Sequence, residues 1–127
     1  MTTKVILVDD HHVFRTGLRA ILASEPDLAV VGEASEARQA YSLLDSAQPD
    51  LVLLDLTLDN EDGFEVFKSL RAVKGCADLV VIALTAHNFP EIELHAKLAG
   101  FAGFVTKPID FEGALFPLMR HLFRKNR

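Results

Sequence analysis

Polar residues stand at the ends of four short apolar runs and are the side chains best placed to do chemistry. They are Asp9 and Asp10 after the first run, Asp55 at the end of the second, Thr85 at the end of the third and Lys107 after the fourth. Apolar runs this short are typical of strands that are covered on both faces of a parallel sheet. Ligands bind such sheets outside the carboxyl ends of the strands. We therefore expect these side chains to gather at one edge.

The chemistry of this group follows from its charges. Three carboxylates brought close together repel one another, and one of them tends to keep its proton unless a cation relieves the repulsion. All-oxygen ligands with few carboxylates and room for water suit Mg²⁺ better than zinc. Lys107 adds a mobile charge that can pair with Asp55, and Thr85 offers a hydroxyl. Such surroundings would stabilise a phosphoryl group carried on Asp55. The alternative is that Asp55 merely caps a strand.

An alternation of strands and helices positions these residues. The expected strands are 4–8, 28–31, 51–54, 79–84 and 103–106, and the expected helices are 11–24, 35–46, 64–73, 88–100 and 110–122. Short apolar strands joined by helices predict an α/β domain, with a parallel sheet that carries helices on both faces. Glu33 follows the second strand and is expected to lie outside the site.

Several local signals set the expected element boundaries. Ser35 is a candidate N-cap for the second helix, and Asn88 for the fourth, with Pro90 in its first turn. The segment 58–63 is polar and is expected to be a loop. Pro117 lies inside the last helix, where a regular helix would lose about 3 kcal/mol, so this helix should be kinked or should start late.

Composition limits the classes of function. The 127 residues suit one domain, 1–127, and a net charge of −5 argues against nucleic-acid binding by this segment alone. No signal peptide precedes the first strand, and no apolar run approaches the ~20 residues of a membrane span, so we expect a cytoplasmic protein without membrane contact. The lone Cys76 is expected to be a small, partly buried residue. Four basic residues near the end, Arg120, Arg124, Lys125 and Arg127, form a tail that is expected to be solvated.

Four motifs carry a resemblance to a known family. They are Val8-Asp9-Asp10, Leu53-Leu54-Asp55, Leu84-Thr85-Ala86 and Thr106-Lys107-Pro108. In this order and spacing they resemble the receiver domain of bacterial response regulators in two-component signalling, and the resemblance covers essentially the whole chain. It implies a flavodoxin-like (βα)5 fold, a doubly wound sheet with five parallel strands in the order 2-1-3-4-5. The N-terminal third resembles regulators with a C-terminal helix-turn-helix of the LuxR/FixJ type.

The resemblance also implies roles for single residues. Asp55 would be the phosphoacceptor, taking a phosphoryl group from a sensor histidine kinase or a phosphotransfer protein. Mg²⁺ would be held by Asp10, Asp55 and the backbone carbonyl of Thr57, with Asp9 acting through water. Lys107 would contact the phosphoryl group.

A second set of implied roles concerns switching. Thr85 would move to hydrogen-bond the phosphoryl group. Phe104, three residues before Lys107, matches an aromatic position that turns inward on activation; the alternative is that Phe104 is a simple core residue. The Lys107–Pro108 bond matches one that is usually cis in the family. The fourth and fifth helices with the fifth strand form a face that such domains often use for homodimers and partners. DNA would be reached only through an output domain that is absent from this chain.

The chain departs from the family pattern after Asp55. Thr57-Leu58 replaces the usual Met-Pro pair, and an acidic run, 59–62, follows. Thr57 in this loop could tune how fast the phosphoaspartate hydrolyses. His87, two residues after Thr85, could touch the rim of the pocket and do the same, although a plain surface histidine is an equal reading. His11 and His12 beside two aspartates suggest a transition-metal site, but adjacent side chains at a helix start diverge, so we expect both to be solvated.

Two other functions fit parts of the pattern. A small aspartate-nucleophile phosphatase of the haloacid-dehalogenase type would place its nucleophile on the first strand with a second acid two residues on. Here Asp55 follows a later strand, and Thr57 stands two residues after it. A receiver that only binds partners, without phosphoryl chemistry, is opposed by the complete set of site residues. We therefore expect a phosphorylated signalling domain that is not an enzyme acting on a separate substrate.

Overall fold

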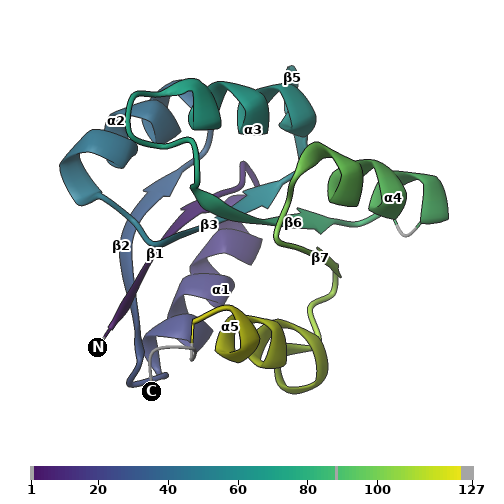
Figure 1. The fold of residues 1–127 in the computed structure, drawn as a ribbon. Helices are drawn as coiled ribbons and strands as arrows, with labels where there is room; N and C mark the ends of the chain where they lie inside the picture. The colour runs from purple at the N-terminus through teal and green to yellow at the C-terminus, as the bar shows by residue number, and fades with distance from the viewer. Residues whose placement is uncertain (1, 88, 124–127) are drawn as a thin grey trace.

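Five apolar segments form one parallel sheet in the computed structural model of the chain, which describes residues 2–87 and 89–123. The strands are β1 (Thr3–Val8), β2 (Leu28–Ala34), β3 (Leu51–Asp55), β6 (Val80–Thr85) and β7 (Gly103–Thr106). Their order across the sheet is β2-β1-β3-β6-β7 (Figure 1). This is the expected flavodoxin-like order, with β6 and β7 as the fourth and fifth strands of the sheet.

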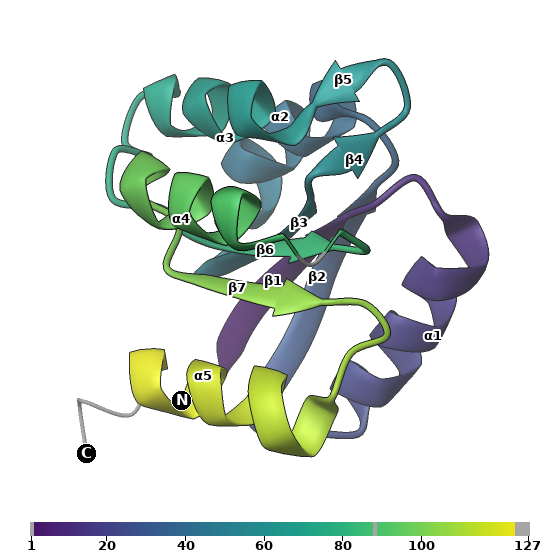
Figure 2. The same cartoon turned by 90° about the vertical axis from the view of Figure 1, so that its right-hand side faces the viewer.

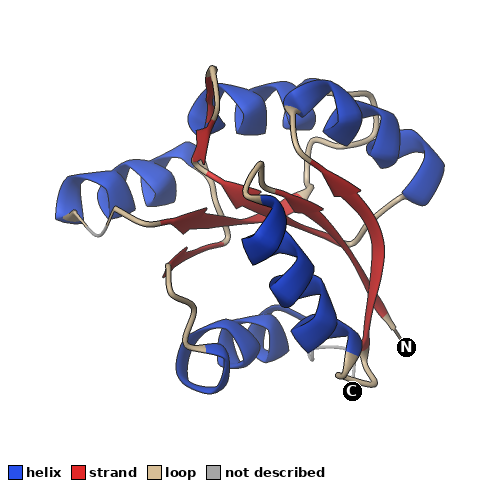
Figure 3. Ribbon diagram, turned by 180° about the vertical axis from the view of Figure 1, so that it is seen from behind, coloured by secondary structure: helices blue, strands red, loops and turns tan. Residues whose placement is uncertain are grey.

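Helices cover both faces of this sheet. They are α1 (His12–Ala23), α2 (Ala37–Ala47), α3 (Gly63–Ala72), α4 (Pro90–Ala99) and α5 (Phe116–Phe123). Helices α1 and α5 lie on one face, and α2, α3 and α4 lie on the other (Figure 3). Alternate residues of each strand point to opposite faces. Ile6 and Val8 therefore pack in the core under α2 and α3, whereas Val5 and Leu7 pack in the core under α1 and α5.

Strand β2 is longer than the sequence predicts. The expected strand 28–31 continues to Ala34, because the register against β1 shifts between Val5 and Ile6 and the pairing then resumes at Gly32. Gly32 does not close the strand. A Cβ atom at Gly32 would lie 2.7 Å from a methyl group of Leu43, so the glycine allows α2 to pack closely on β2.

The segment after β3 folds into a hairpin where the sequence predicts a loop. Strands β4 (Thr57–Leu58) and β5 (Glu61–Asp62) pair antiparallel, and Asn60 in the turn between them has a φ of 60°. Leu58 is buried, which ties this polar segment to the core. Figure 2 shows the β4–β5 hairpin at the edge of the domain, directly before α3. The expectation of a plain loop is therefore wrong.

The helix starts follow the expected signals only in part. Ser35 is not the N-cap of α2: Glu36 is, without a side-chain cap, and the backbone N–H of Ser35 donates instead to Gln39 Oε1 at 2.7 Å. Pro90 begins α4, as expected. Asn88, the other expected cap, lies outside the described residues.

Pro117 is accommodated by a late start of the last α-helix. A π-helical turn, η1 (Phe111–Leu115), precedes α5, and the N–H of Leu115 donates to the Asp110 carbonyl five residues back. Pro117 is thus the second residue of α5, where a missing N–H is tolerated. The late start confirms one of the two sequence expectations.

Three composition-based expectations concern segments outside the core. Cys76 is half-buried and unpaired in the described chain, as expected. Within residues 2–87 and 89–123, no helix combines the length and apolar character that crossing a membrane requires. Arg124, Lys125 and Arg127 of the basic tail lie outside the described residues.

Candidate functional site

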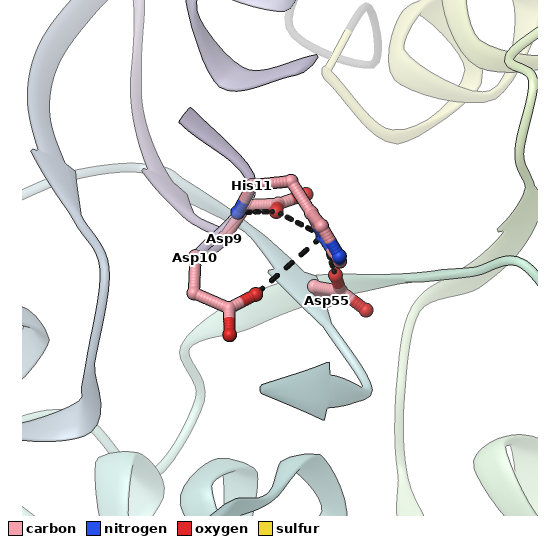
Figure 4. Close-up of side chains that lie close together, drawn as sticks. All are labelled: Asp9, Asp10, His11 and Asp55. Atoms are coloured by element: carbon pink, nitrogen blue, oxygen red, sulfur yellow. Dashed lines mark hydrogen bonds and ion pairs between the residues drawn. The ribbon is translucent and has the colours of Figure 1, made fainter. Parts of the chain in front are cut away.

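The carboxyl ends of β1 and β3 bring three aspartates together. One side-chain ligand atom from each of Asp9, Asp10, His11 and Asp55 lies within 4.8 Å of the others (Figure 4). Asp9 and Asp55 are almost completely buried, with 1% and 0% of their surface exposed. The neighbouring strands β1 and β3 pair in parallel, so their ends deliver these acids to the same place. Asp9, Asp10 and Asp55 therefore lie close together at one edge of the sheet, as the sequence predicts.

Both oxygens of Asp55 have partners. Oδ1 accepts hydrogen bonds from the Thr57 backbone N–H at 2.9 Å and from the Thr57 hydroxyl at 3.0 Å. Oδ2 accepts one from Lys107 Nζ at 3.0 Å. Burial by itself would raise the pKa of Asp55, but the bonds from Thr57 and Lys107 outweigh it and hold the pKa below its usual value. Asp55 is therefore an ionised carboxylate at neutral pH.

Lys107 joins the two buried acids. Its Nζ donates to Asp9 Oδ2 at 2.8 Å as well as to Asp55 Oδ2, and it lies 4.0 Å from the centre of the Phe14 ring. The peptide bond from Lys107 to Pro108 is cis, and the Lys107 N–H donates to the Thr85 carbonyl at 2.8 Å. The expected pairing with Asp55 is present, and the bond to Asp9 adds to it. One ammonium thus bonds two carboxylates and offsets only part of their charge.

Asp10 is bonded on one side only. Its Oδ2 accepts a hydrogen bond at 2.7 Å from the backbone N–H of Asp59 in the β4–β5 hairpin. Its Oδ1 is buried and has no hydrogen-bond donor among the described residues. A buried carboxylate oxygen without a partner is costly, and a cation would satisfy it. The free Oδ1 next to the oxygens of Asp9 and Asp55 fits a hard divalent cation such as Mg²⁺.

His11 is exposed, as the sequence predicts, but its ring also reaches the acid cluster. Its Nδ1 is 3.1 Å from Asp9 Oδ1, 3.5 Å from Asp10 Oδ1 and 3.4 Å from Asp55 Oδ2, although 60% of the side chain is exposed. The cause is local: His11 is the N-cap of α1, and its backbone N–H donates to Asp9 Oδ1 at 2.8 Å. This turn folds the ring back over the acids. The hydrogen bond to Asp9 raises the pKa of His11.

His12 behaves as the sequence predicts and stays exposed on α1. The spacing of the Asp9-Asp10-His11 triplet relative to the helix start is the signal that could have distinguished the two histidines. A residue at the N-cap position can turn its side chain back towards the preceding residues, whereas the next residue already follows the helix surface.

The side chains of the expected switch lie on the other side of Asp55. Thr85 is buried, and its hydroxyl accepts a hydrogen bond from the His87 N–H at 3.0 Å rather than bonding Asp55. His87 is exposed, with its ring 6.1 Å from that of Phe89. Phe104 is half-buried and lines a pocket of about 190 Å³ between α4 and β7. A hydrogen bond thus joins Thr85 to His87, whereas Phe104 packs against the core at the pocket between α4 and β7.

An outer layer supports Asp9. Glu33 Oε1 accepts from Arg15 Nε at 3.0 Å, and Glu33 Oε2 accepts from Arg19 at 2.8 Å. Arg15 in turn donates to the backbone carbonyl of Asp9. Glu33 therefore lies outside the acid cluster, as expected, but it holds the arginine that supports the turn after β1. Arg15 is a contributor that sequence reasoning missed, because nothing local links it to Asp9.

Comparisons with known proteins place this geometry in a family. The model of the family described as "Response regulator receiver domain" matches residues 5–115. The DNA-binding transcriptional activator DevR/DosR of Mycobacterium tuberculosis is 41% identical over 106 residues, covering 84% of this chain and 48% of that protein. The nitrate/nitrite response regulator protein NarL of Escherichia coli K12 is 35% identical over 111 residues, covering 87% and 50%.

Solved structures agree with the sequence relatives. The crystal structure of a two-component response regulator of the LuxR family from Aurantimonas sp. SI85-9A1 matches with a TM-score of 0.84 and 34% identity, over 96% of this chain and 86% of that one. The chain spans about half the length of the curated relatives that it matches. The phosphatase alternative finds no support, because Asp55 ends β3 rather than the first strand. The chain belongs to the response regulator receiver domain family of two-component systems.

Proposed function

We propose that residues 1–127 form one receiver domain in which Asp55 accepts a phosphoryl group and thereby switches the interactions of the domain. The observation that carries the proposal is the setting of Asp55: a fully buried carboxylate that accepts hydrogen bonds from Thr57 and Lys107 beside the free Oδ1 of Asp10. A buried carboxylate that stays charged in a polar cluster at a strand end is the arrangement a nucleophile needs.

Mg²⁺ is the cofactor that the donor set suits. We assign it to Asp10, Asp55 and the backbone carbonyl of Thr57, with Asp9 acting through water. When bound, the ion neutralises charge on the phosphoryl oxygens and on the clustered carboxylates. The free Oδ1 of Asp10 supports the assignment, because it is the buried oxygen in this cluster that still needs a partner.

Asp55 is the nucleophile of the transfer step. One of its oxygens attacks the phosphorus of a phosphohistidine on the donor, the P–N bond breaks, and the histidine leaves with its electron pair. Lys107 now bonds both Asp9 and Asp55, so it can turn to the phosphoryl oxygens without leaving the pocket. The domain itself catalyses both the transfer of the phosphoryl group to Asp55 and the later hydrolysis of the acyl phosphate. It does not turn over a separate substrate.

Thr85 and Phe104 carry the switch in this proposal. The Thr85 hydroxyl gives up the His87 N–H and turns to a phosphoryl oxygen, and Phe104 moves inward from its half-buried position. The phosphoryl group shifts the balance between two arrangements of the β6–α4 loop and β7. Thr57, whose exposed side chain bonds Asp55, and His87 at the rim tune the lifetime of the phosphoaspartate.

The partners follow from this role. We assign the donor to a sensor histidine kinase or a phosphotransfer protein in the cytoplasm. A second copy of the chain could pair through the α4, β7 and α5 face as a homodimer. The relative DevR/DosR is a DNA-binding activator, so DNA regulation through an output domain beyond this chain is part of the proposal.

Intact mass after incubation with acetyl phosphate and Mg²⁺ tests the proposal. We expect one added phosphoryl group on the wild type, and none on the Asp55→Asn variant. Asp45→Asn, which changes an acid of α2 outside the site, is the matched control and should label as the wild type does. Undiminished labelling of Asp55→Asn would refute the assignment of Asp55.

A further inference from the structure

The β4–β5 hairpin holds two carboxylates of the acid cluster. At its start, Thr57 donates twice to Asp55 Oδ1. At its turn, the backbone N–H of Asp59 donates to Asp10 Oδ2 at 2.7 Å. Because Oδ2 is held in this way, the free Oδ1 of Asp10 is the oxygen that faces the cluster, 3.5 Å from His11 Nδ1. The direction in which Asp10 points therefore depends on where the hairpin lies.

Little within the hairpin itself fixes its position. Two-residue strands pair weakly, and an isolated hairpin is marginally stable at best. Leu58 is buried and provides one anchor. Glu61 provides another, because its Oε1 accepts the backbone N–H of Ala37 at 2.9 Å in a half-buried contact. This contact joins positions 24 residues apart in the sequence.

The partner of Glu61 is an otherwise uncapped helix start. Ala37 is the first residue of α2, the first turn of α2 has no acid, and among the described residues the side chain of the N-cap Glu36 makes no capping hydrogen bond. A helix N-terminus needs side-chain acceptors, because its first backbone N–H groups have no partner within the helix. Glu61 of the hairpin thus supplies the side-chain acceptor that the residues at the start of α2 do not provide.

We propose that Glu61 is a positioning residue for the metal site: it fastens the hairpin to α2, keeps the Asp59 N–H on Asp10 and so leaves Asp10 Oδ1 directed at the cation. The inference rests on the proposed function, since it takes Asp10 as a ligand of Mg²⁺. Glu61 itself contacts neither the cation nor the phosphoryl group.

The variants must separate the loss of the contact between Glu61 and Ala37 from two simpler effects, the loss of one negative charge and a general loosening of the domain. Glu61→Ala removes the acceptor and one negative charge. Glu61→Gln removes the charge but keeps an oxygen for Ala37. Asp62→Asn is the matched control, because it removes one charge from the neighbouring position of the hairpin and keeps an oxygen for the Phe64 N–H that Asp62 caps. Ala37→Pro removes the donor instead, at the first helical position, where proline is well tolerated.

The measurement is a Mg²⁺ titration followed by amide NMR signals, without any phosphoryl donor. We expect Glu61→Ala to weaken Mg²⁺ binding roughly tenfold, the lower end of the range for residues that orient metal ligands. Ala37→Pro should weaken it by a similar factor, and the double variant should be no weaker than either, because both break one contact. Glu61→Gln and Asp62→Asn should stay within about twofold of the wild type, as one screened charge allows.

A second readout reports the anchoring directly. In the metal-free protein, the Asp59 amide should exchange its hydrogen faster in Glu61→Ala and Ala37→Pro, and at the wild-type rate in Glu61→Gln and Asp62→Asn. The Leu53 amide in β3 should not change in any variant, which separates a released hairpin from a generally loosened domain.

Each adverse outcome has a defined meaning. Wild-type Mg²⁺ affinity in Glu61→Ala, or in Ala37→Pro if Glu61→Ala does not fold, overturns the inference. Glu61→Gln as weak as Glu61→Ala also overturns it, because charge would then be the cause and not the contact with Ala37. Absence of Mg²⁺ binding by the wild type would count against the proposed function and not against the anchoring of the hairpin.

Discussion

The two sides of Asp55 are built differently. On the acid side, which comprises Asp9, Asp10 and Lys107, the buried carboxylates are held by strong contacts between segments far apart in the chain, such as Lys107 with Asp9. On the switch side, which comprises Thr85, His87 and Phe104, the Thr85 hydroxyl is held by a backbone group only two residues away.

The difference follows from charge. A buried carboxylate needs strong partners, because leaving it unpaired costs several kcal/mol. A neutral hydroxyl needs one hydrogen bond, worth about 1 kcal/mol, and can exchange it for another at little cost. The acid side is therefore suited to holding a cation and a nucleophile in place. The switch side is suited to changing its contacts when a phosphoryl group arrives.

Lys107→Ala should have the largest effect on stability. It leaves the buried carboxylates of Asp9 and Asp55 without their cation, so the free energy of unfolding without Mg²⁺ should fall by about 3 kcal/mol. Added Mg²⁺ should recover more stability in the variant than in the wild type. Urea unfolding with and without Mg²⁺ measures both. Lys68→Ala, at an exposed position of α3, is the control, and equal stability of the two variants would contradict the account.

Thr85→Ala should have a smaller effect on stability and a larger one on switching. Loss of the bond from the His87 N–H should cost about 1 kcal/mol of unfolding free energy. Asp55 should still be labelled by acetyl phosphate, whereas the change in the Phe104 ring signals on labelling should disappear from NMR spectra. Thr85→Ser keeps the hydroxyl and should retain that change. A full Phe104 response in Thr85→Ala would show that Thr85 does not couple the two sites.

His87→Ala should have the smallest effect on stability. The ring is exposed, so the unfolding free energy should change by no more than about 0.5 kcal/mol. Removing the ring opens the rim to water, so the phosphoaspartate should hydrolyse faster, by roughly twofold. Decay of the phosphorylated mass with time measures the rate. His121→Ala, on α5, is the control. Equal phosphoaspartate lifetimes in both variants would show that His87 is an ordinary surface residue without influence on hydrolysis.

The fold and the centre of the site were accessible from the sequence for one physical reason. In a parallel sheet, strand ends collect at one edge, so a residue directly after an apolar run has a predictable place. Asp9, Asp55, Thr85 and Lys107 all occupy such positions, and the four motifs that contain them are also what resemble the family.

What the tertiary structure alone decided are the contacts made by residues away from the strand ends. Arg15 donates to the backbone carbonyl of Asp9, a contact that no local pattern predicts. Glu61 reads in the sequence as one more charge of an acidic loop, yet it caps α2. Sequence patterns report periodic burial, and they do not report which helix start lies within hydrogen-bond reach of a hairpin, because that distance depends on how separate elements pack together.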